Sequence, residues 1–107
     1  MSVIERVGPL ADLPEGKPLR VEIGDRAVSV VRIGDDVYAI GDRCSHQDVS
    51  LSEGDVDCDE RTLECWKHGS AFSLETGEPT SLPATKPVPV YEVRVVDGQI
   101  EVVVEDG

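Results

Sequence analysis

Two short motifs, Cys44-x-His46 and Cys65-x-x-His68, contain the residues of this chain that are best suited to bind a metal. The chain has only two histidines, and each follows a cysteine at a spacing that allows chelation. Together the motifs offer two thiolates and two imidazoles, which are ligands for zinc, for iron and for iron–sulfur clusters. We therefore predict one metal centre built from two arms of the chain.

Three interpretations of these four residues differ in their chemistry. As ordinary buried residues, both histidines would stand beside cysteines by coincidence. As a structural zinc site, they would depart from the usual pattern, which places two cysteines on one arm and two histidines on the other. A [2Fe–2S] centre with two histidine ligands accommodates the mixed arms, because Cys44 can bind one iron and His46 the other. The residues favour the cluster and leave the zinc site as an alternative.

The rest of the chain predicts the short strands and turns of an all-β protein. The 107 residues fit one domain, spanning residues 1–107. Its apolar residues are mostly Val, with Ile and Leu, which favour strands, and ten glycines and seven prolines interrupt it at short intervals. Residues 42–89 have little periodicity and indicate a metal-bearing insertion between β-rich ends. We predict strands at 3–7, 18–23, 26–33, 37–40, 55–58, 62–65, 90–96 and 99–104. Three pairs form hairpins: 26–33 with 37–40, 55–58 with 62–65, and 90–96 with 99–104, which turns at Asp97-Gly98.

The chain is strongly acidic, with 22 Asp and Glu against 10 Lys and Arg and a formal net charge of −12. This balance excludes nucleic acid as a partner, since phosphate binding needs clustered basic side chains, and it disfavours anionic membranes. The acidity favours solubility and can steer the protein toward a positively charged partner. No signal-peptide pattern and no membrane-spanning apolar run are visible, so we expect a cytoplasmic protein with reduced thiols.

The segments that surround the two motifs resemble a known family. Gly69-Ser70, Phe72, Thr76-Gly77 and the proline-rich run 82–87 follow the second motif. In these features the chain resembles the Rieske-type ferredoxins of bacterial multicomponent oxygenase systems. The resemblance implies an antiparallel β-sandwich with a small cluster-binding subdomain at about 42–89, and one [2Fe–2S] cluster per chain.

By the pattern of that family, Cys44 and Cys65 bind one iron, and His46 and His68 bind the other. Two ferric ions, two sulfides and two thiolates carry no net formal charge, because neutral imidazoles add none. An electron enters a neutral centre more easily than a doubly negative one. We therefore expect a reduction potential above that of all-cysteine plant-type ferredoxins.

Three positions separate this chain from the high-potential Rieske proteins of respiratory complexes. Val49 and Lys67 stand where those proteins carry a pair of disulfide-bonded cysteines, and Phe72 stands where they carry a tyrosine that donates a hydrogen bond toward a ligand sulfur. Ser70 remains as a donor. Hydrogen bonds to sulfur stabilise the reduced state, so their loss predicts a potential at the low end of the Rieske range, on the order of −150 mV.

The resemblance implies an electron carrier without catalytic activity of its own. Its partners would be a flavin-containing reductase and a terminal oxygenase, because both histidines are already assigned and no glycine-rich dinucleotide motif is present. Two alternatives remain: a Rieske protein associated with iron–sulfur cluster assembly proteins, and a zinc-binding interaction module.

Three further features have simple interpretations. Trp66 either packs over the cluster-binding loop or faces a partner. Cys58 is expected to be a half-buried strand residue. The run Pro83–Pro89 is expected to form a stiff cover over the cluster.

Overall fold

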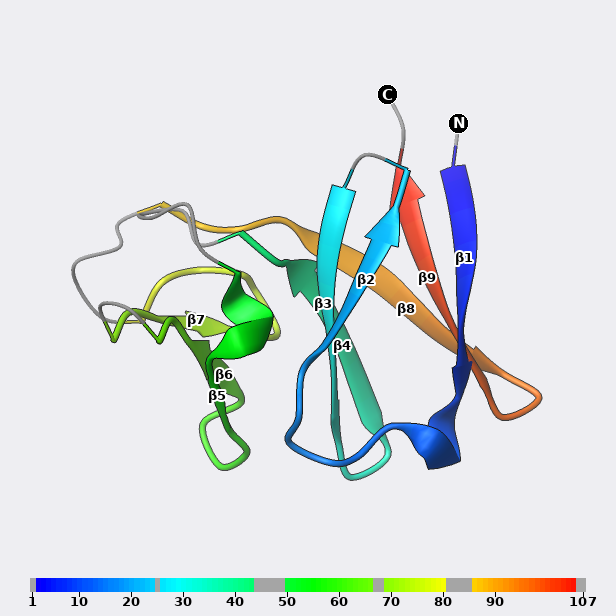
Figure 1. Cartoon of the computed structure of the whole chain (residues 1–107), viewed down its shortest axis with the longest axis horizontal. Helices are drawn as coiled ribbons and strands as arrows, with labels where there is room; N and C mark the ends of the chain where they lie inside the picture. Colours follow the sequence, from blue (N-terminus) through cyan, green and yellow to red (C-terminus); the bar gives the residue numbers. More distant parts are fainter. Residues whose placement is uncertain (1, 25, 44–49, 67–68, 81–85, 106–107) are drawn as a thin grey trace.

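The structure is a computed structural model and describes residues 2–24, 26–43, 50–66, 69–80 and 86–105 (Figure 1). These residues form two antiparallel sheets, with strand orders β1-β9-β8-β4-β3-β2 and β5-β6-β7. The large sheet comprises β1 (Ser2–Pro9), β2 (Leu19–Ile23), β3 (Arg26–Ile33), β4 (Asp36–Gly41), β8 (Val90–Val96) and β9 (Gln99–Glu105). The small sheet comprises β5 (Asp55–Asp57), β6 (Thr62–Glu64) and β7 (Ala71–Ser73). Two 3-10 turns, η1 (Leu10–Asp12) and η2 (Leu51–Glu53), interrupt the connections.

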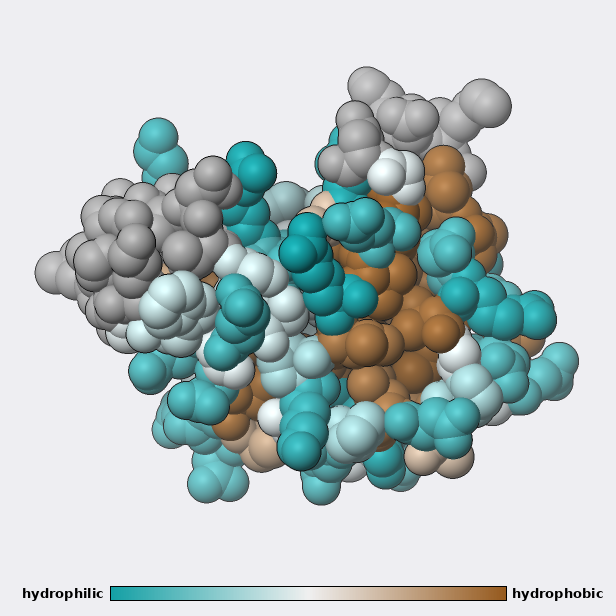
Figure 2. Space-filling view, in the orientation of Figure 1, coloured by the Kyte–Doolittle hydropathy of each residue, from teal (hydrophilic) through white to brown (hydrophobic). Residues whose placement is uncertain are grey.

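The large sheet curls so that its edge strands β1 and β2 approach each other (Figure 1). Its concave side encloses an apolar cluster drawn mainly from β2, β3 and β9. Hydrophobic side chains also gather at the surface over the two edges (Figure 2), where Val3 of β1 and Leu19 of β2 are each 41% exposed. The curl brings the first and last strands of the chain together, because β1 pairs with β9.

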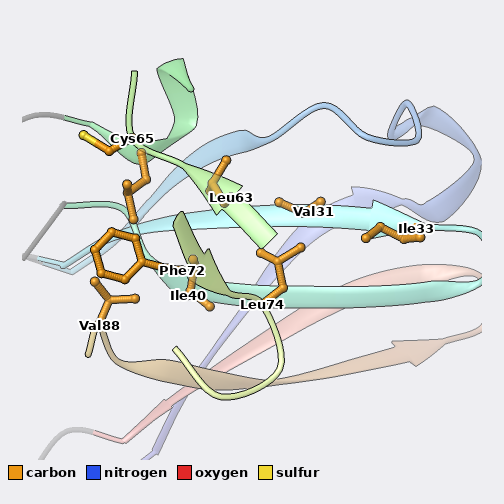
Figure 3. Close-up of a cluster of buried hydrophobic side chains, with 9 residues drawn as sticks. Val31, Ile33, Ile40, Leu63, Cys65, Phe72, Leu74 and Val88 are labelled. Carbon is orange, nitrogen blue, oxygen red and sulfur yellow. The ribbon is translucent and has the colours of Figure 1, made fainter. Parts of the chain in front are cut away.

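Strand β3 is buried on both of its faces and separates two apolar clusters. Val28 and Val30 point into the cluster inside the large sheet, whereas Val31 and Ile33 belong to a second cluster shared with the small sheet (Figure 3). This position explains the nearly continuous apolar sequence of the strand, since a strand covered on both sides does not alternate between apolar and polar residues.

The small sheet is apolar on one face and acidic on the other. Val56, Leu63 and Phe72 pair across its three strands and face the second cluster. The neighbouring positions Asp55 and Glu64 pair on the opposite, exposed face. This alternation follows from the two-residue period of a strand. The apolar face packs the small sheet against β3 and β4.

The all-β prediction is confirmed, and every predicted strand is present with small differences at its ends. The three predicted hairpins are also present. Asp97 and Gly98 have φ values of 52° and 77°, as a two-residue turn between twisted strands requires. The pairing of β1 with β9 and of β4 with β8 was not predicted. No helix within the described ranges is long and apolar enough to cross a membrane.

Gly77 holds the chain that follows the proline-rich run against the turn after β7. The amide of Val88 donates to the carbonyl of Gly77 at 2.8 Å. A Cβ atom at Gly77 would lie 2.2 Å from the carbonyl oxygen of Val88, and the φ of Gly77 is +76°. Glycine is therefore needed here both for its left-handed backbone and for the close approach.

We expect Gly77→Ala to destabilise the protein more than Gly98→Ala does. Both glycines have nearly the same φ, but a Cβ at Gly98 meets nothing within 4 Å. Gly98→Ala should cost about 1–2 kcal/mol for its backbone conformation alone, and Gly77→Ala should cost roughly 1–3 kcal/mol more for the collision. Urea unfolding of the two variants measures the difference. Equal losses of unfolding free energy would show that the Val88 carbonyl moves aside freely.

Candidate metal centre

Cys65 follows the last residue of β6 and is fully buried. It lies in the apolar cluster between the two sheets, together with Leu63, Phe72 and Leu51 (Figure 3). These neighbours leave little water around the sulfur. A thiolate at such a position needs a positive partner, because burial strongly disfavours an isolated charge.

The second arm of the motif pair is closed by two backbone hydrogen bonds. The amide of Cys65 donates to the carbonyl of Ser70 at 2.6 Å, and the amide of Gly69 donates to the carbonyl of Cys65 at 3.0 Å. Gly69 has φ +74°, which allows the chain to reverse. Ser70 is itself fully buried. The end of β6 and the start of β7 are therefore held together by these hydrogen bonds, and Cys65 is fixed at the end of β6.

The first arm is closed at its base on both sides. Arg43 and Ser50 form an isolated antiparallel bridge, and the amide of Leu51 donates to the carbonyl of Asp42 at 2.5 Å. The amide of Asp42 in turn donates to the carbonyl of Ala27 at 3.0 Å, which ties the base to β3. Residues 42–43 and 50–51, which flank the first motif, are thus held together at the edge of β3.

The bases of the two arms are packed against each other. Leu51, which follows the first arm, shares the apolar cluster with Cys65. A Cβ atom at Gly54 would lie 1.8 Å from the carbonyl oxygen of Glu64, the residue before Cys65. The residue after η2 and the end of β6 are therefore in direct backbone contact, so the bases of the two arms lie side by side.

Of the four predicted ligands, only Cys65 lies among the described residues. Cys44, His46 and His68 lie outside them. Within the described part of the chain, no group of three or more His, Cys, Asp or Glu side chains is placed to hold a metal ion. The structure thus locates one predicted ligand and the bases of both arms, and the ligand set itself stays a prediction.

Asp42 is a buried carboxylate at the base of the first arm and belongs to neither of the two motifs. Burial raises the pKa of this carboxyl, but hydrogen bonds from Ser29, Ser50 and Ser52 outweigh it and lower the pKa below its ordinary value. No sequence signal marks Asp42, because its partner Ser29 lies on a different strand and comes near only in the folded chain.

Arg61 connects the small sheet to the large one. Its guanidinium donates to Asp36 Oδ2 at 3.0 Å and to the hydroxyl of Tyr38, both on β4, and lies 5.7 Å from the centre of the Tyr38 ring. Hydrogen bonds to Asp36 and then to Tyr38 raise the pKa of Arg61. The carbonyl of Arg61 accepts from the amide of Leu74 at 2.9 Å. These contacts fix the orientation of the β5–β6 turn on β4.

The interpretation of Cys58 needs correction. Cys58 is not a half-buried strand residue: β5 ends at Asp57, and Cys58 is exposed in the following turn. Trp66 is 55% exposed, so its side chain is accessible to a partner. The predicted cover Pro83–Pro89 lies partly outside the described residues; Val88 is buried, whereas Pro87 and Pro89 are exposed.

These features define a small two-sheet β protein with a buried cysteine at the meeting point of two loops. The protein-family model described as the Rieske [2Fe-2S] domain matches residues 4–92. The chain therefore belongs to the Rieske [2Fe-2S] domain family, and the predicted resemblance is confirmed. Membership implies a [2Fe–2S] cluster, and the burial of Cys65 at the joined bases fits a thiolate ligand of such a group.

Relatives and solved structures agree with this assignment. The 3-phenylpropionate/cinnamic acid dioxygenase ferredoxin subunit of Escherichia coli strain K12 is 44% identical over 92 residues, which cover 86% of this chain and 85% of that protein. The ferredoxin of carbazole 1,9a-dioxygenase from Nocardioides aromaticivorans IC177 matches with a TM-score of 0.91 and 38% identity, covering 94% of this chain and 96% of that one. A chain in the complex of reduced oxygenase and oxidized ferredoxin in carbazole 1,9a-dioxygenase matches with a TM-score of 0.86 and 40% identity, covering 92% and 99%.

Proposed function

We propose that this protein is a Rieske [2Fe–2S] ferredoxin that carries single electrons from a flavin-containing reductase to a terminal oxygenase. The observation that carries the proposal is the match to oxygenase ferredoxins over nearly the full length of both chains. The fold supports the same conclusion, because the described residues build a scaffold around one buried cysteine. On this proposal the protein has no catalytic activity of its own and works in the cytoplasm.

We assign the four ligands as the motifs predict. Cys44 and Cys65 would hold one iron, and His46 and His68 the other, with one cluster per chain. When bound, the cluster accepts and releases one electron. Residues 1–107 would form one domain, and residues 42–89 its cluster-binding subdomain. The hydrogen-bonded bases of both arms favour this role. They limit the change in ligand geometry between the two oxidation states, and a smaller change makes electron transfer easier.

The acidic face of the small sheet suits a basic partner surface. Its three strands contain three acidic residues and no basic ones. Asp55 and Glu64 stand directly opposite each other on β5 and β6, which costs stability because like charges repel. This pair of charges is therefore better explained by electrostatic steering toward a positively charged reductase or oxygenase than by a contribution to stability.

The second candidate is a Rieske protein that serves iron–sulfur cluster assembly. The ferredoxin subunits of dioxygenases among the relatives favour the oxygenase role. Neighbouring genes for an oxygenase and a reductase would support the first function, and genes for cluster-assembly proteins the second. A zinc module would be colourless and silent on reduction.

The cofactor and its ligands can be tested together with two cysteine variants. Reduced wild-type protein should give a Rieske-type EPR signal with two irons and two sulfides per chain. Cys65→Ala should lose the signal and the iron, because it removes a ligand. Cys58→Ala is the matched control and should keep both, since Cys58 is exposed in a turn. A wild-type protein without the signal, or a Cys65→Ala variant that retains it, would overturn the assignment.

The low potential can be tested at Phe72, which is fully buried beside Cys65 in the same cluster. We expect a midpoint potential on the order of −150 mV. Phe72→Tyr should raise it, because the added hydroxyl can donate toward a ligand sulfur and stabilise the reduced state. Phe72→Leu changes the packing without adding a donor and should not raise it. A fall in potential for Phe72→Tyr, measured by redox titration of the visible spectrum, would contradict the argument.

Trp66 tests the docking surface, because it is exposed and adjoins a predicted ligand. Trp66→Ala should slow the oxidation of the reduced protein by the oxygenase of carbazole 1,9a-dioxygenase by about tenfold, as expected for an aromatic anchor at an interface. Val95→Ala removes another exposed apolar side chain, on β8, and should not change the rate. The wild-type rate should also fall as salt increases. Stopped-flow measurements at two salt concentrations check all three expectations; equal rates for Trp66→Ala and wild type would exclude Trp66 from the interface.

A further inference from the structure

Asp42 is the one acidic side chain that is buried among the described residues, with 2% of its surface exposed. Its Oδ1 accepts hydrogen bonds from Ser29 Oγ at 2.5 Å and from the amide of Ser52 at 2.9 Å. Its Oδ2 accepts from Ser50 Oγ and lies 3.5 Å from Nε of Arg20. Because burying a carboxylate is costly, this dense set of donors is what makes the position stable.

The donors come from two different parts of the fold. Ser29 lies on β3 and Arg20 on β2, so they belong to the large sheet. Ser50 and Ser52 lie on the far side of the segment 44–49, which starts two residues after Asp42. One carboxylate thus joins the entrance of the first arm, its exit and the large sheet.

The backbone alone gives a weaker closure. The Arg43–Ser50 bridge and the hydrogen bond from the amide of Leu51 to the carbonyl of Asp42 bring the two ends of the arm together. Neither of these two interactions involves β2. The backbone of this base is tied to β3 by the hydrogen bond from the amide of Asp42 to the carbonyl of Ala27. The side chain of Asp42 therefore adds both the contact to Ser50 and the anchoring on Ser29.

Resting on the proposed function, we propose that Asp42 is a positioning residue for the first metal-binding arm, and that its buried charge lowers the reduction potential of the cluster. The carboxylate fixes both ends of the arm that carries Cys44 and His46. Its negative charge opposes the arrival of an electron nearby, and burial limits screening by water and salt. Arg20 offsets this only in part, because its side chain is 52% exposed and 3.5 Å away.

Three variants separate the two effects. Asp42→Asn removes the charge and weakens the hydrogen bonds. Ser50→Ala removes one donor and leaves the charge in place. Asp35→Asn is the matched control, since it makes the same chemical change at an exposed position in the turn between β3 and β4. All three are made in the cluster-containing protein.

We expect Asp42→Asn to raise the midpoint potential and to release iron to an excess of EDTA about tenfold faster than wild type, because charge-assisted hydrogen bonds are lost. Ser50→Ala should also release iron faster but should not raise the potential. Asp35→Asn should match wild type in both measurements. If Asp42 had only a structural role, Asp42→Asn would release iron faster, but its midpoint potential would equal that of Asp35→Asn.

Two results would overturn the inference. One is a potential and an iron-release rate of Asp42→Asn equal to those of Asp35→Asn. The other applies if Asp42→Asn does not fold: an iron-release rate of Ser50→Ala equal to that of wild type. Failure of the proposed function looks different, because wild-type protein would then lack the Rieske EPR signal before any variant is compared.

Discussion

The apolar cluster between the two sheets is the contact on which the rest of this structure depends. It is assembled from β3 and β4 of the large sheet, from β6 and β7 of the small sheet, and from the residues that follow the first arm. Cys65 is a member of it, so the same packing that joins the sheets also fixes a predicted metal ligand. Because side chains in such an interior are closely packed, the position of the cysteine is set by several distant segments at once.

Polar contacts at the rim of this cluster complete the positioning. Asp42 gathers donors at the base of the first arm, and Arg61 ties the β5–β6 turn to Asp36 and Tyr38 on β4. Gly54 and Gly77 permit backbone approaches that a larger residue would block. Asp42 and Arg61 hold parts of the 42–89 region against the large sheet, whereas the two glycines let segments within that region approach each other. A rigid frame of this kind suits a one-electron carrier, whose centre has to keep its geometry in two oxidation states.

The charge of the protein is distributed in a way that matches the same function. The interior around Cys65 is apolar, whereas the outer face of the small sheet is acidic. The apolar interior and the acidic exterior act at different ranges: the interior influences the reduction potential of a bound cluster, and the exterior influences the encounter with a partner. Trp66 directly follows the buried Cys65 and is itself exposed, so it lies where the apolar interior meets the surface.

The all-β class, most strand positions, the three hairpins and the family could be predicted from the sequence, because these depend on local patterns. Alternating apolar residues, the Asp97-Gly98 turn and the two cysteine–histidine motifs are each readable within a few neighbouring positions. The exposure of Cys58 was misjudged for a related reason: a strand pattern does not say at which residue the strand ends.

The contacts between distant segments could be learned only from the folded chain. It placed β1 beside β9, buried both faces of β3, and brought Leu51 and Gly54 against the end of β6. It also revealed Asp42, whose importance depends on Ser29 and Arg20, residues that lie far from it along the chain. Such contacts arise from the packing of whole sheets, and no short stretch of sequence contains them.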